Sequence, residues 1–62
     1  MKYRMYMVTD AAQKSLNQEF EADSDDDAIE EVKEFRKDTG IPVKAIARVD
    51  SNNIETVIRE FD

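Results

Sequence analysis

SDDDAIEEVKEFRKDTGI, residues 24–41, is the one long segment of this chain with helical periodicity. Its apolar side chains recur at spacings of three and four residues and so form one stripe along a helix, made of Ala28, Ile29, Val32 and Phe35. Ser24, with Asp27 three residues later, resembles a capping box and predicts where the helix begins. Gly40 and Pro42 predict where it ends, because glycine adopts the left-handed conformation and proline blocks continuation.

Two segments ahead of the helix alternate polar and apolar residues, as strands do. In residues 2–9 the alternation places on one face Tyr3, Met5 and Met7, and on the other Lys2, Arg4, Tyr6 and Val8. In residues 16–22 the inward side chains are Leu16, Phe20 and Ala22, and the outward ones are Asn17, Glu19 and Glu21. A register with Met5 opposite Phe20 and Arg4 opposite Glu21 satisfies both faces of this predicted pair.

Two further strands are predicted after the helix, over residues 43–50 and 54–61, with an asparagine-rich turn between them. Strict alternation turns towards the helix Val43, Ala45, Ala47 and Val49, and away from it Lys44, Ile46 and Arg48. Hairpin pairing then places beside the first set Ile54, Thr56 and Ile58, and beside Ile46 the side chains of Val57 and Phe61.

The element order therefore predicts an α+β fold of the type ββαββ, a single domain over residues 1–62. The short link at residues 40–42 makes the helix and the third strand antiparallel. Placing the first and third strands in the middle gives a four-stranded antiparallel sheet of order 2-1-3-4, with the helix on one face. The alternative order 1-2-3-4 would make the second and third strands a parallel central pair, which fits the polarity of the second strand less well.

Composition excludes several classes of function. The chain has no cysteine and no histidine, so it has no disulfide, no thiolate metal site and neither of the commonest catalytic groups. It has one glycine and therefore no glycine-rich phosphate loop. The net charge of −6 disfavours free nucleic acid as a partner, because phosphate binding requires clustered lysine and arginine. We expect a non-enzymatic, cytoplasmic protein without a cofactor, a metal or a membrane span.

Acidic side chains are concentrated between residues 19 and 34, where nine of them accompany a single base, Lys33. Such rows of carboxylates occur in proteins that imitate nucleic acid and occupy a basic groove of a partner protein. A solvated helix face is the competing interpretation. The predicted acidic binding surface consists of Glu19, Glu21, Asp26, Glu30, Glu31 and Glu34.

A calcium loop is an alternative use of the same acids. Asp23, Asp25, Asp27 and Glu34 match the spacing of the first, third, fifth and twelfth ligands of an EF-hand. The sixth position, where the loop requires glycine, is Ala28. Because the helical stripe also runs through the segment, the sequence disfavours a metal site.

The sheet face away from the helix provides a second candidate surface. It is predicted to carry an apolar group made of Tyr6, Val8, Ile46, Val57 and Phe61. An exposed apolar patch often marks an interface, and self-association would add core to so short a chain. A structural homodimer joined through this outer face is therefore the alternative to a partner-binding protein.

The run FEADSDDDAIEEVKEF, residues 20–35, joins a strand to an acidic cap and then to a helix with Ala28 and Ile29 on its inner face. This pattern resembles short ββα proteins of phages and mobile elements, some anti-CRISPR proteins among them. The resemblance implies a protein that binds and blocks a larger one. We therefore expect a small acidic protein-binding module, an inhibitor or DNA mimic directed at a basic nucleic-acid-binding partner.

Overall fold

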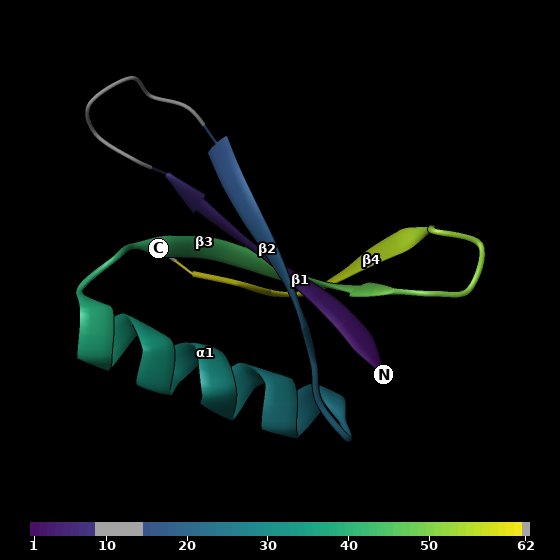
Figure 1. Cartoon of the computed structure of the whole chain (residues 1–62), viewed down its shortest axis with the longest axis horizontal. Helices are drawn as coiled ribbons and strands as arrows, with labels where there is room; N and C mark the ends of the chain where they lie inside the picture. The colour runs from purple at the N-terminus through teal and green to yellow at the C-terminus, as the bar shows by residue number, and fades with distance from the viewer. Residues whose placement is uncertain (9–14, 62) are drawn as a thin grey trace.

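A computed structural model describes residues 1–8 and 15–61 of the chain. The elements are β1 (Lys2–Val8), β2 (Ser15–Glu21), α1 (Asp25–Thr39), β3 (Val43–Val49) and β4 (Glu55–Glu60). The strands form one antiparallel sheet of order β2-β1-β3-β4, which confirms the predicted ββαββ topology. Figure 1 shows α1 as a separate layer along one face of this sheet. No helix of the described residues is long and apolar enough to cross a membrane.

The helix begins and ends where its capping residues predict. The Ser24 side chain accepts a hydrogen bond from the backbone N–H of Asp27 at 3.2 Å. Gly40 has φ 70°, in the left-handed region, and its N–H donates to the carbonyl of Arg36. Three aspartates occupy the first turn and two bases the last turn, as the helix dipole favours.

The core lies between α1 and the central strands. Its buried side chains come from β1, from the helical stripe and from β3, and they are Tyr3, Met5, Met7, Ala28, Val32, Val43 and Ile46. The predicted inward face of β1 is thus confirmed. Phe20 and Phe35 pack against this core but remain partly exposed.

The predicted register between β1 and β2 is wrong by two residues. Tyr3, rather than Met5, lies opposite Phe20, and Arg4 lies opposite Glu19. This register stacks the rings of Tyr3 and Phe20 at 5.7 Å between centroids and pairs Arg4 with Glu19 on the other face. A shift of two residues keeps every side chain on its predicted face, because strand side chains alternate with a period of two.

The prediction that Ile46 lies on the outer sheet face is wrong. The register of β3 against β1 shifts between Tyr6 and Met7, so that Tyr6 pairs with Ala45 but Met7 pairs with Val43. The extra residue, Lys44, forms a bulge and inverts the facing of the rest of β3. Ile46 therefore lies opposite Met5 with no exposed surface. The same inversion turns to the outer face three side chains that strict alternation placed towards the helix, namely Ala45, Ala47 and Val49.

The prediction that Phe61 lies on the outer sheet face is also wrong. A second register shift, between β3 and β4, pairs Ile46 with Arg59 and Ala47 with Val57. Phe61, just beyond β4, packs against the core, and the Arg36 guanidinium of α1 lies 4.5 Å from its ring centroid. Phe61 is therefore on the helix side of the sheet, whereas Val57 lies on the outer face as predicted.

Candidate functional site

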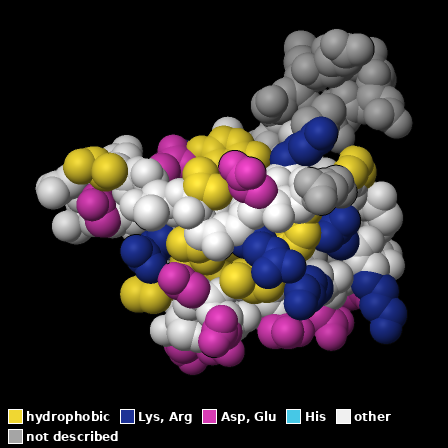
Figure 2. Space-filling model, turned by 180° about the vertical axis from the view of Figure 1, so that it is seen from behind, with side chains coloured by type: hydrophobic (Ala, Val, Ile, Leu, Met, Phe, Trp, Pro, Cys, Tyr) yellow, Lys and Arg dark blue, Asp and Glu magenta, His cyan; other side chains and the backbone are white. Residues whose placement is uncertain are grey.

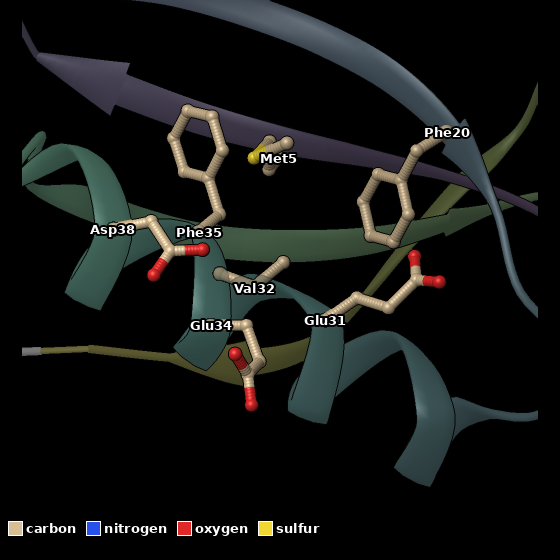
Figure 3. A pocket seen from close by; sticks show the side chains of 7 residues that line it. All are labelled: Met5, Phe20, Glu31, Val32, Glu34, Phe35 and Asp38. Atoms are coloured by element: carbon tan, nitrogen blue, oxygen red, sulfur yellow. The ribbon is translucent and has the colours of Figure 1, made fainter.

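An apolar groove lies between α1 and the β1–β2 half of the sheet. Phe20 of β2 and Phe35 of α1 form its sides, and Met5 and Val32 form its floor. Figure 3 shows the two rings well apart, with the Met5 side chain between them. The groove is open to solvent and has a volume of about 330 Å³. This is the lower end of the range for ligand pockets, which run from roughly 300 Å³.

Carboxylates form the rim of this groove. Glu31, Glu34 and Asp38 of α1 line it, and no basic side chain does so among the described residues. In Figure 3 the Glu31 side chain extends towards Phe20, while Asp38 lies beside Phe35. The site therefore combines an apolar interior with negative charge on one side.

None of the three bases of α1 lines the groove, and one of them, Lys33, pairs with Glu30 at 3.9 Å. The acidic side of α1, with Glu31 and Glu34, borders the groove on the β2 side. Its basic side reaches β4, where Arg36 stacks on Phe61. Figure 2 shows bases gathered across the middle of one broad face and acids along its lower edge.

A second hollow continues the acidic surface to the corner between β2 and α1. It is lined by Glu21, Ala22, Asp23, Asp27, Glu30 and Glu31. Glu31 belongs to both hollows, so the two form a continuous acidic surface from the end of β2 to the last turn of α1.

The structure brings together four of the six acids predicted as a binding surface: Glu21, Glu30, Glu31 and Glu34. Asp26 is exposed on the first turn of α1 and lines neither hollow. Glu19 lies on the opposite face of the sheet, where it pairs with Arg4 and with Lys2 at 3.8 Å. The hydrogen bond from Arg4 lowers the pKa of Glu19. Glu19 is therefore part of a different surface.

Sequence reasoning missed the groove itself, because it assigned Phe20 and Phe35 to the closed core. A signal was present in the helix. Asp27, Glu31, Glu34 and Asp38 recur at spacings of four, three and four along one edge of the apolar stripe. Such a row predicts an acidic border beside the apolar residues.

The start of α1 is fixed to the sheet by Asp25. Its carboxylate accepts hydrogen bonds from the Tyr3 hydroxyl at 2.7 Å and from Arg48 at 2.8 Å. The bond from Tyr3, together with Arg48, lowers the pKa of Asp25. Burial, with the neighbouring carboxylate, raises the pKa of Tyr3 to about 12. These contacts orient the acidic side of α1, and they occupy a carboxylate that the calcium alternative required.

The outer sheet face carries an ionic network rather than a continuous apolar patch. Arg4 contacts Glu19 and, at 3.1 Å, Glu55, and the Tyr6 hydroxyl donates to Glu55. Of the predicted apolar residues of this face, Tyr6 and Val57 lie on it, and Val57 is 56% exposed. The Val8 side chain lies outside the part of the chain that the structure describes.

Comparison with known proteins gives no family for this chain: no protein-family model, curated protein or solved structure matches it. Within residues 1–8 and 15–61, no group of three or more acidic side chains is arranged to hold a metal ion.

Proposed function

We propose that this protein is a small, non-enzymatic binding module that holds a basic partner protein against the α1–β2 surface. The observation that carries this proposal is the apolar groove bordered by Glu31, Glu34 and Asp38. An apolar interior supplies affinity by removing surface from water, and the charged border selects and orients a partner of opposite charge. This combination favours a protein partner over a free anion or free nucleic acid.

The class of partner follows from the charge. A row of carboxylates presents to a basic groove the same sign of charge as a nucleic-acid backbone. A nucleic-acid-binding protein that meets this surface would be occupied by it and kept from its own ligand. The β2–α1 segment also resembles short ββα proteins of phages and mobile elements, some anti-CRISPR proteins among them, and this resemblance implies the same role.

Self-association through the outer sheet face is the alternative function. It receives less support, because Ile46 and Phe61 are not on that face and Tyr6 donates its hydroxyl to Glu55. The Val57→Glu variant separates the two functions in sedimentation experiments. A dimer disrupted by this substitution would favour self-association, whereas an unchanged mass with retained partner binding favours the module.

Affinity capture from an extract of the source organism tests the proposal. The tagged wild-type protein should retain a basic partner that is released as salt rises. The reason is that the Debye length, over which charges attract one another, falls from ~10 Å at 0.1 M salt to ~3 Å at 1 M. The variant Glu30→Lys/Glu31→Lys/Glu34→Lys should lose this partner.

A matched control carries the same change in net charge at acids outside β2 and α1, namely Asp10→Lys/Glu60→Lys/Asp62→Lys. It should retain the partner. Equal retention by both variants, or a partner that high salt does not release, would refute the proposed function.

A further inference from the structure

We infer that the groove between Phe20 and Phe35 receives the apolar ridge of a basic amphipathic helix belonging to the partner. This inference rests on the proposed function and adds the conformation and side-chain chemistry of the segment that binds. It is carried by the juxtaposition of an uncovered apolar surface with the acidic border of α1.

The apolar part of the site is a vacant position in the helical layer. Among the strands, α1 packs most closely against β3, and its far side contacts Phe61 beyond β4. Among the described residues, none packs over the helix-side surface of β2 as α1 packs over β3, and there Phe20 is partly exposed and Leu16 is 50% exposed. A sheet face is normally covered by packed elements, and a helix beside α1 would cover this half.

The dimensions of the groove suit a short length of helix. The α1 residues that line it run from Glu31 to Asp38, which is two helical turns or about 10 Å. A second helix packs with its axis roughly 8–10 Å from the axis of the first. Side chains at i, i+4 and i+7 of that helix form a ridge about 10 Å long, which matches the length of the groove. Leucine or a similar side chain on that ridge would enter between Phe20 and Phe35, above Met5.

The charge on the rim selects a basic helix. Lysine or arginine beside the apolar ridge would meet the carboxylates of Glu31, Glu34 and Asp38 across the groove. An acidic helix would bring like charges together in the same place. The occupant is therefore a segment of a basic partner protein.

The direct test uses a synthetic peptide of about 14 residues, rich in lysine, with leucines at i, i+4 and i+7. On titration into the labelled protein, NMR shifts should concentrate on the four apolar residues of the groove: Met5, Phe20, Val32 and Phe35. A scrambled peptide of the same composition, and one with alanine in place of leucine, should bind at least about tenfold more weakly. Equal affinity of these peptides, or no binding of the first, would overturn the inference.

Protein variants test the same contact from the other side. Phe20→Ala should weaken the leucine peptide at least about tenfold, because it removes one side of the groove. Val57→Ala is the control on the outer face of the sheet, outside the groove, and should leave affinity unchanged. Retained binding by folded Phe20→Ala would exclude the groove. If the lysine substitutions of Glu30, Glu31 and Glu34 still abolished partner capture, the proposed function would stand while this inference failed.

Discussion

Replacing Ile46 by alanine tests the inverted facing of β3. Strict alternation would place this side chain on the outer face, whereas the bulge at Lys44 buries it with no exposed surface opposite Met5. Truncating a buried isoleucine to alanine destabilises a protein by about 2–5 kcal/mol, which combines lost burial with the cavity left behind. A chain of this size has a total stability of roughly 3–9 kcal/mol, so the loss is a large part of it.

Thermal and urea denaturation followed by circular dichroism measure this loss. At ~4–8 °C per kcal/mol for a domain of this size, Ile46→Ala should lower Tm by at least about 8 °C. Ile54→Ala is the matched control, because it removes the same atoms from a side chain that is 60% exposed. It should change stability by less than ~0.5 kcal/mol. Equal effects of the two substitutions would refute the bulge and restore simple alternation.

Three other outcomes are expected. Folding raises the pKa of Tyr3 from 10.0 to about 12. The contribution of the Tyr3 hydroxyl to the free energy of unfolding is therefore complete below pH 10 and is lost as pH rises towards 12. The hydrogen bond to Glu55 also raises the pKa of Tyr6. Tyrosinate absorbance of the folded protein should therefore rise at a higher pH than that of free tyrosine, for Tyr3 and for Tyr6. Gly40→Ala should cost ~1–2 kcal/mol in urea denaturation and Gly40→Asn less, since asparagine tolerates the left-handed backbone; equal costs would argue against that conformation. Glu34→Lys should stabilise the free protein by a few tenths of a kcal/mol and at the same time weaken partner capture. If stability and partner capture instead rose or fell together, Glu34 would not be part of the binding surface.

The helix and the topology could be predicted because their determinants are local. Ser24 and Gly40 set the bounds of α1 through their own backbone and side-chain chemistry. The short connections on either side of α1 restrict how strands can be ordered. These signals act within a few residues of one another, so no knowledge of distant contacts is needed.

The facing of β3 and the end of β4 could not be predicted, because a bulge is decided by packing across strands. Nothing in VKAIARV marks Lys44 as the extra residue. With the bulge, Val43 keeps its inward position and Ile46 joins it in the core, while Ala45, Ala47 and Val49 face outward. The second shift, between β3 and β4, places Phe61 beneath Arg36 and removes it from the predicted outer patch.

The like charges along α1 lower the stability of the free protein. Glu30 and Glu34, like Glu34 and Asp38, are four residues apart, so each pair of like charges destabilises the free helix by a few tenths of a kcal/mol. A helix face needed only for solubility could alternate bases with these acids at no such cost. A basic segment seated in the groove would relieve the repulsion and cover the apolar floor in the same step. If the proposed function holds, the free protein is less stable than a chain without these repulsions would be, and the difference would be available as affinity for a partner of positive charge.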